Sequence, residues 1–410
     1  MKRKLKLQTA FGCQSNLKVV TDDIFAVWWD SKFDYQADAE IIFKHLKKIR
    51  QDCLQNLGME DPPNPSAGFY YNVYIHHGEQ DSFPSEWGNG QGTDKYQLPF
   101  LTLPVGVHTS ESNLYHEGFH IFQYQANSEG FAYKGDSQWY VEASAQWYMC
   151  QNQPQETNAF VEAGAMGANP HLSLWHSFSN QAEGDPTDWL YQVRQYGMHT
   201  YLYYLTNVAK VSPDLITNGF YLGTDLSPQE YLYKQIGADH LRKYFADWAA
   251  HNTGSLDYLT PEQITRAELE VKNVADPNNL HPYVRSYDNP KQVKGWISPP
   301  ETFKPRGWAY NVIRVQNCGS GIYRFELTGD LVGSEGAVSH FEGRIVVSSE
   351  TQKLYAKINM VDAISGQGVV RVTNNCSELF LVAASVPEHF SGTQTYGYQA
   401  KIEIDSSTYQ

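Results

Sequence analysis

The sequence lacks any run of about 20 apolar residues, which a membrane-spanning helix would need, and it has no excess of basic residues. Lysine and arginine together number 31, against 45 aspartates and glutamates, so the formal net charge is −14. Such a chain has no positive field to attract phosphate backbones. We therefore expect no membrane span and no nucleic-acid partner. Hydrophobic residues make up 41% of the chain and charged residues 19%, which is typical of a packed globular protein.

Cysteine is also scarce, with five residues and no CxxC pair. Neither a disulfide framework nor a thiolate zinc site is indicated. Cys318 and Cys376 lie in the same C-terminal region, so they either pair in an oxidising compartment or are two buried thiols.

The first residues are basic, but polar Gln8 and Thr9 interrupt any apolar core of a secretory signal. We expect no intact signal peptide. The 28 tyrosines and 10 tryptophans are nevertheless typical of an exported protein, so the compartment stays open.

At 410 residues the chain is too long for one ordinary core. Apolar periodicity predicts strands at 24–29 and 69–75 and a helix at 39–57, followed by mostly helical sequence to about 275. Prolines and asparagines then mark an irregular connection, after which short alternating segments predict strands. We expect an α+β chain: a small sheet plus helices in residues 1–300, then an all-β sandwich in residues 301–410.

The stretch before the central motif is extended and apolar. Residues 87–94 are glycine-rich without the Lys-Ser/Thr of a phosphate loop, so we interpret them as a surface loop. Residues 98–107 predict a strand, and Pro99 and Pro104 within it favour a sheet edge. An extended substrate is expected to pair with residues 98–103 of that edge.

The segment HEGFH contains two histidines four residues apart. Ser110 can cap a helix over 111–126, which places His116 and His120 on one face, within reach of a single metal ion. The intervening Glu117 can take a proton from a metal-activated water without being a ligand. This spacing predicts a catalytic zinc site.

A catalytic zinc site of the His₂Glu kind takes its third ligand from elsewhere in the chain. Glu142 is our candidate, because it lies 22 residues after His120 on its own predicted helix, 138–151. The small residues that follow it allow two helices to approach closely. His76, His77 and His108 carry no such spacing, and core or surface roles are favoured for them.

The segments YHEGFHIFQ (115–123) and WYVEASA (139–145) resemble the gluzincin clan of zinc peptidases. The resemblance is closer to the Svx/AvrXca-type family of secreted bacterial virulence and avirulence proteins. The segments LFLVAASVPEH (379–389) and YGY (396–398) resemble the β domain of that family.

The resemblance implies a gluzincin-like domain with His116, His120 and Glu142 as zinc ligands and Glu117 as general base. Gluzincins commonly supply an oxyanion partner from a later helix, which here implies Tyr196, then His199. The family's aspartate four residues after the ligand glutamate is replaced here by Gln146, whose amide oxygen can accept an imidazole N–H.

The expected function is a zinc-dependent endopeptidase acting on a peptide or protein substrate. One alternative is a binding protein that uses a peptidase scaffold and recognises protein or glycan, with possible glycan contact through the C-terminal domain. Another is a zinc hydrolase acting on a non-peptide amide or ester. The family resemblance implies secretion, and the sequence leaves the oligomeric state open.

Overall fold

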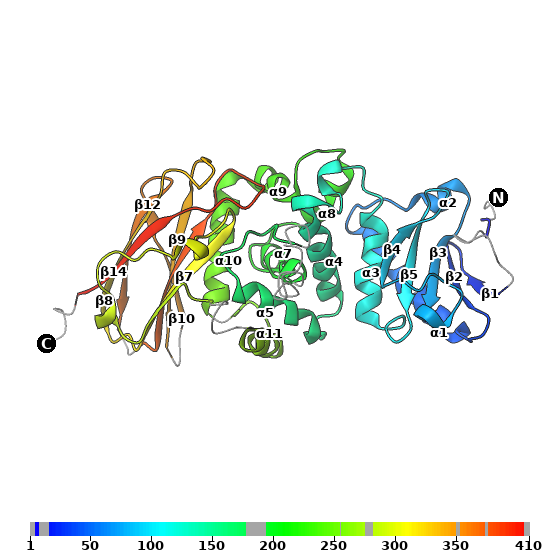
Figure 1. Ribbon diagram of the computed structural model, residues 1–410, viewed down its shortest axis with the longest axis horizontal. Coiled ribbons are helices and arrows are strands. Elements are labelled where there is room, and N and C mark those ends of the chain that lie inside the picture. The colour runs from blue at the N-terminus through cyan, green and yellow to red at the C-terminus, as the bar shows by residue number, and fades with distance from the viewer. Residues whose placement is uncertain are drawn as a thin grey trace. The chain divides into compact units, whose positions relative to one another are not determined.

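A computed structural model describes residues 5–7, 16–177, 194–254, 256–274, 282–349, 353–373 and 376–405 (Figure 1). The chain forms two compact units. The first comprises Met1–Ala132, Ser144–Glu156 and Ser212–Leu226, and the second comprises Tyr133–Ala143, Thr157–Val211 and Ser227–Gln410. Mixed helices and sheets confirm the α+β class.

The first unit contains a five-stranded sheet with the order β1-β2-β3-β5-β4. Its strands β2, β3 and β5 run parallel, whereas β1 and β4 are antiparallel to their neighbours. Every residue of β2 and β3 is buried, which is why their sequences are mostly apolar on both faces instead of alternating. The strands are β1 (Leu17–Thr21), β2 (Phe25–Asp30), β3 (Tyr71–His76), β4 (Gly90–Thr93) and β5 (Pro99–Pro104).

The predicted edge strand is wrong in one respect. Strand β5 is interior, because β3 and β4 pair with its two sides. Among the described strands of this sheet, β4 is the edge beside it, and β4 arises from the glycine-rich segment that we interpreted as a loop. The prolines are tolerated because Pro99 and Pro104 stand at the first and last positions of β5.

Two helices of this unit pack closely against each other. Helix α1 (Gln36–Gln55) and helix α3 (Glu111–Gln123) meet at Gly118. A Cβ at that position would lie 2.7 Å from Cδ1 of Ile49 and 3.1 Å from Cδ2 of Leu46. The glycine therefore permits the close approach of α3 to α1. The unit also contains α2 (Pro63–Ala67), α8 (Asp214–Thr217) and the second part of α4 (Gln138–Asn152).

The second unit contains a cluster of buried aromatic rings. Phe245 and Trp248 on α10 contact Trp308 and Tyr310, with ring centroids 5.6 Å apart for Phe245 and Trp308. The helices are the first part of α4, α5 (Val161–Ala168), α7 (His199–Asn207), α9 (Pro228–Ile236), α10 (Ala238–Gly254) and α11 (Pro261–Val274). Residues 178–193, which belong to the stretch predicted to be mostly helical, lie outside the described residues.

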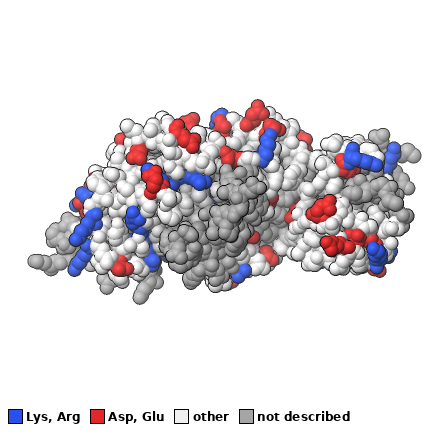
Figure 2. Space-filling model, in the orientation of Figure 1, with Lys and Arg blue, Asp and Glu red and all other residues white. Residues whose placement is uncertain are grey.

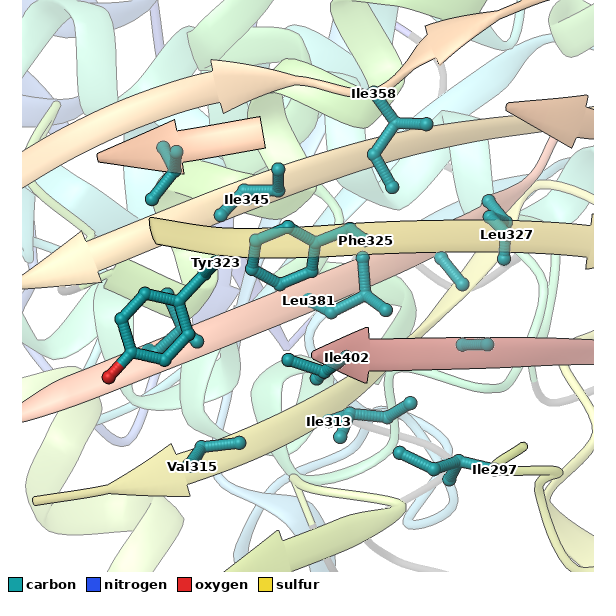
Figure 3. Close-up of a cluster of buried hydrophobic side chains, with 14 of the residues drawn as sticks. Ile297, Ile313, Val315, Tyr323, Phe325, Leu327, Ile345, Ile358, Leu381 and Ile402 are labelled. Carbon is teal, nitrogen blue, oxygen red and sulfur yellow. The ribbon is translucent and has the colours of Figure 1, made fainter. Parts of the chain in front are cut away.

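Two antiparallel-rich sheets complete the second unit. Their orders are β10-β9-β13-β7-β6 and β11-β12-β8-β14. They face each other across a core to which both contribute, including Ile345 and Leu381 from the first and Phe325 and Ile402 from the second (Figure 3). The strands are β6 (Arg285–Tyr287), β7 (Ala309–Gln316), β8 (Gly321–Gly329), β9 (Phe341–Ser348), β10 (Lys353–Lys357), β11 (Asn359–Met360), β12 (Ser365–Val372), β13 (Glu378–Ser385) and β14 (Tyr398–Asp405).

Helix α10 covers the outer side of the first of these sheets. Arg344 of β9 donates to Asp247 of α10 at 2.5 Å, and Arg242 donates to the carbonyl of Val386 at 3.1 Å. The boundary that we placed at residue 300 thus falls inside a compact unit, and an accessory domain of residues 301–410 stays a prediction.

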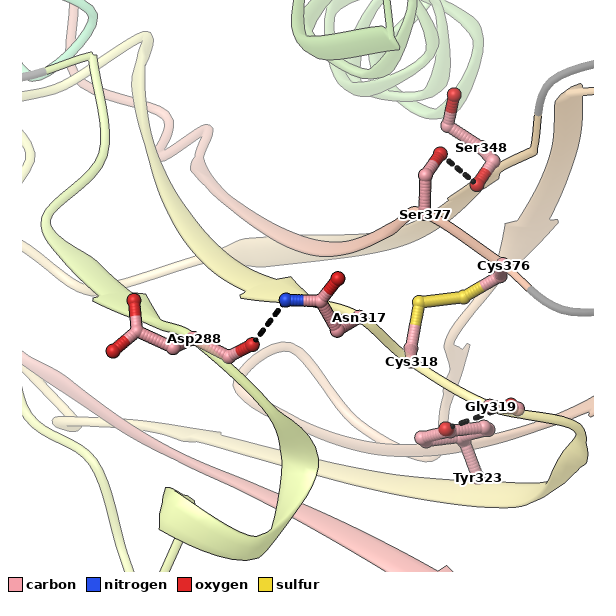
Figure 4. Close-up of a disulfide and its surroundings, with 8 residues drawn as sticks. All are labelled: Asp288, Asn317, Cys318, Gly319, Tyr323, Ser348, Cys376 and Ser377. Carbon is pink, nitrogen blue, oxygen red and sulfur yellow. Dashed lines mark hydrogen bonds between the residues drawn. A yellow bond between two sulfur atoms is a disulfide. The ribbon is translucent and has the colours of Figure 1, made fainter.

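A disulfide joins Cys318 and Cys376, whose Cα atoms are 5.1 Å apart (Figure 4). It links the segment after β7 to the segment before β13, two strands that already pair with each other. Asn317 beside it donates to the carbonyl of Asp288 at 2.9 Å. The sequence left open whether these cysteines pair or are buried thiols, and in the structure they pair.

No described helix is long and apolar enough to cross a membrane. On the face shown in Figure 2, charged side chains of both signs are scattered among uncharged residues.

Candidate metal centre

Helix α3 presents the two motif histidines together. Ser110 caps its N-terminus by accepting from the backbone N–H of Asn113, as predicted. The Nε2 atoms of His116 and His120 lie 3.2 Å apart, and the two rings are nearly perpendicular. Two imidazole nitrogens that converge in this way can share one metal ion.

The ring of His120 is oriented by a neighbour that the sequence analysis missed. Its Nδ1 lies 2.6 Å from Oε1 of Gln123, one helical turn further along α3. Because an amide oxygen can only accept, Nδ1 carries the proton and Nε2 offers its lone pair. Gln123 in turn donates to Oγ of Ser144 at 2.7 Å. Among the described residues Gln146 makes no such bond, so the role considered for Gln146 belongs to Gln123.

The third predicted ligand lies on helix α4. Ser144, which holds Gln123, fixes α4 beside α3, and Glu142 is two residues earlier on the same helix. Glu142 is 6% exposed. One ligand atom each from His116, His120 and Glu142 lie within 4.8 Å of one another. Two imidazoles and a carboxylate at this spacing are a donor set that suits zinc and leaves room for a fourth, exchangeable position.

Glu117 is held in place by the edge strand and the loop before it. Nδ2 of Asn89 donates to Oε1 of Glu117 at 2.7 Å and to Oδ1 of Asn113 at 2.6 Å. Gln91 of β4 donates to the backbone carbonyl of Glu117 at 3.2 Å. The Glu117 side chain is 7% exposed, so its position is set by these bonds and by packing.

Tyr133 is a further candidate that sequence reasoning missed. Its hydroxyl group bonds with Glu142, Gln138 and Gln195, and burial, followed by the charge of Glu142, raises the pKa of Tyr133. The phenol therefore stays protonated at neutral pH and can donate a hydrogen bond near the predicted ligand. The signal is its position nine residues before Glu142, just ahead of α4, which no hydrophobic periodicity marks.

The two predicted oxyanion residues are both described. His199 is fully buried at the start of α7, where Nδ1 lies 2.9 Å from the carbonyl of Tyr196 and the ring packs edge-on against Phe160. Tyr196 is half-buried. Their assignment stays a prediction, whereas Tyr133 forms a hydrogen bond with the ligand candidate Glu142.

No protein-family model matches the chain, and no curated protein matches it. Among solved structures the chain is similar to a family GH115 4-O-methyl-α-glucuronidase with specificity for decorated arabinogalactans, at 9% identity and a TM-score of 0.18. That match covers 86% of this chain and 54% of the glucuronidase, so the chain spans about half the length of that protein. A likeness at this TM-score establishes neither a shared fold nor a shared activity.

Proposed function

We propose that the chain is a zinc-dependent endopeptidase of the gluzincin type. The observation that carries the proposal is the convergence of His116, His120 and Glu142 within 4.8 Å beside the buried carboxylate of Glu117. A structural role alone would not need two imidazoles and a buried carboxylate to meet in this way, because buried carboxylates are costly unless they are paired or coordinate a metal.

His116, His120 and Glu142 would hold the zinc. When bound, zinc acts as a Lewis acid that makes water nucleophilic near neutral pH and polarises a substrate carbonyl. Glu117 accepts the proton that the attacking water loses and passes it to the leaving amine. Asn89 keeps the Glu117 carboxylate oriented for that transfer through its 2.7 Å bond.

Tyr133 is our candidate for stabilising the negative charge that develops on the substrate oxygen. Its hydroxyl is protonated and lies at the Glu142 carboxylate. A preorganised donor of this kind contributes most where charge appears only in the transition state.

The position of β4 at the edge of its sheet favours a peptide as the substrate. It pairs with β5 on one side, and Gln91 of β4 contacts the backbone of Glu117. Its other edge can bond with the main chain of an extended substrate. This placement replaces residues 98–103, because residues 100–102 at the centre of that segment are paired on both sides. The resemblance to the Svx/AvrXca-type family is part of the same proposal.

The test is cleavage of a denatured-protein and peptide library by the zinc-loaded wild type and by Glu117→Gln. The proposal requires cleavage by the wild type and its loss by a factor of at least about 10² in the variant, with zinc retained. Zinc binding without Glu117-dependent cleavage would favour the alternative, a binding protein that uses a peptidase scaffold. Turnover of small esters with no peptide cleavage would favour the non-peptide hydrolase.

A further inference from the structure

An open groove lies on the second sheet of the β region, far along the chain from the metal ligands. Its volume is about 450 Å³, and charged lining residues include Arg324 of β8 and Lys401 and Glu403 of β14. Its rim is formed by the segment 290–295, which precedes Trp296. A volume of this order is typical of small-ligand sites.

The register of this segment places Trp296 on the same outer face as the groove, next to the lining residue Gly295. Ile297 and Ala400 form an antiparallel bridge and exchange both main-chain hydrogen bonds, at 2.7 and 2.9 Å. Both side chains are buried toward the core. Side chains alternate along a strand, so the neighbours of this pair, Trp296 and Lys401, both point to the opposite, outer face.

On the outer face, polar side chains of β14, β8 and β12 lie opposite one another on neighbouring strands. Lys401 is opposite Glu326, which is opposite Gln367, and Glu403 is opposite Arg324. Lys401 pairs with Glu403 at 2.6 Å and lies 3.9 Å from Glu326. These four residues are two cations and two anions, with the amide of Gln367 beside them and Arg371 further along the same face of β12. Both signs of charge are therefore interleaved on this face, and neither forms a continuous patch.

Trp296 is unusual for so large a ring. It is 47% exposed, and among the described residues no hydrogen bond or ring contact engages it. Exposed tryptophans offer a flat apolar face, and the neighbouring Lys, Arg, Glu and Gln side chains offer both donors and acceptors. A ligand with apolar C–H faces and many hydroxyl groups, and without net charge, fits this combination.

We infer that the outer face formed by Trp296, Lys401, Glu326, Arg324 and Glu403 binds a neutral polysaccharide chain. One sugar ring stacks on the Trp296 indole, and the charged side chains bond with the hydroxyl groups of that sugar and the next. Strand β14 and the segment containing Ile297 hold the tryptophan and its polar partners in register. This site is independent of the metal centre and of the proposed hydrolysis.

The test is affinity electrophoresis of the full chain in native gels that contain hydroxyethylcellulose, galactomannan or arabinoxylan, with polygalacturonate as the anionic comparison. At least one neutral polysaccharide should retard the wild type, and Trp296→Ala should weaken that binding by roughly tenfold. Because the ring is half-exposed, the variant should fold normally. Glu117→Gln should bind like the wild type, which separates this site from the proposed activity.

The matched control is Tyr96→Ala, which removes an aromatic side chain of similar exposure, 50%, from the first unit and should leave retardation unchanged. No retardation by any of the three neutral polysaccharides would overturn the inference. So would equal retardation of the wild type and Trp296→Ala, or retardation by polygalacturonate alone, since the last is binding by charge only.

Discussion

Gln123 sets the orientation of a candidate zinc ligand, although it does not belong to the motif. Its amide joins Nδ1 of His120 to the hydroxyl of Ser144, and so links α3 to α4 at the site. Partners of this kind fix the tautomer of a metal-binding imidazole. The amide can do this without adding the negative charge that an aspartate would bring.

Replacing Gln123 with Ala should lower zinc affinity by about 10- to 100-fold, because His120 loses the acceptor that holds its ring. Competition titration with a zinc chelator measures the change. The matched control is Gln146→Ala, which removes a buried glutamine from α4; among the described residues, Gln146 has no bond to a ligand histidine. Equal losses in the two variants would contradict the role of Gln123.

Replacing Tyr133 with Phe should lower kcat on a peptide substrate by about 10² to 10³, with little change in KM and with zinc retained. The hydroxyl is lost, whereas the ring and its packing remain. Tyr196→Phe and His199→Ala are the comparison, because the family resemblance points to them. If either of these lowers kcat while Tyr133→Phe does not, the assignment of Tyr133 is wrong.

The sequence was informative at the motif and less so around it. HExxH spacing indicates two ligands and a base because a helix of known pitch fixes which side chains share a face. Gln123 could have been found by the same periodicity, one turn after His120. Asn89 and Tyr133 could not, because they reach the site from irregular segments whose course depends on tertiary packing.

At the scale of elements, Gly118 shows why the motif has a glycine between its histidines. Gly118→Val should destabilise the first unit by about 1–3 kcal/mol, since the new methyl groups would overlap Ile49 and Leu46 of α1. Thermal or urea unfolding measures the loss.

The control for Gly118→Val is Glu40→Val, on the exposed side of α1, which has the same β-branched side chain in a helix without a packing conflict. If the two substitutions lower stability equally, the close contact between α1 and α3 does not constrain position 118.

The edge of the first sheet could not be predicted from composition, because composition favoured β5 and the edge is β4. Prolines indicated that residues 98–107 lie at an edge, but at the two ends of β5 they cost few ladder bonds. Glycines hid β4. Gly92 is needed there because a Cβ would lie 2.5 Å from Cζ of Phe100 on the neighbouring strand. That requirement comes from the pairing of two strands and is not visible in either strand alone.

At the scale of the whole molecule, the second unit has a covalent link as well as a hydrophobic core. The two cysteines are 58 positions apart in the sequence, so the disulfide closes a long loop. It therefore strongly reduces the conformational entropy of the unfolded chain. Disulfides of this kind form in oxidising compartments.

Replacing both Cys318 and Cys376 with Ser should lower the free energy of unfolding by about 2–4 kcal/mol. Unfolding should be followed with and without a reducing agent. The wild type should lose a similar amount on reduction, and the double variant should be insensitive to it. A wild type whose stability does not change on reduction would contradict a stabilising role for this bond.

The two units also show what local patterns leave out. The strands of residues 301–410 were predicted because short alternating or apolar runs are local signals. The attachment of α10 to β9 through Arg344 and Asp247 joins residues nearly a hundred positions apart. The change near residue 276 marks a change of secondary structure within the second compact unit, and a separate accessory domain of residues 301–410 stays a prediction.

The central claim is that His116, His120 and Glu142 hold one zinc ion on which a Glu117-dependent hydrolysis relies. The most direct test is zinc content per chain after exhaustive dialysis, measured together with peptide cleavage. Wild type and Glu117→Gln should each retain one zinc, with cleavage only by the wild type, and Glu142→Ala should retain none. Full zinc in Glu142→Ala, or undiminished cleavage by Glu117→Gln, would contradict the account.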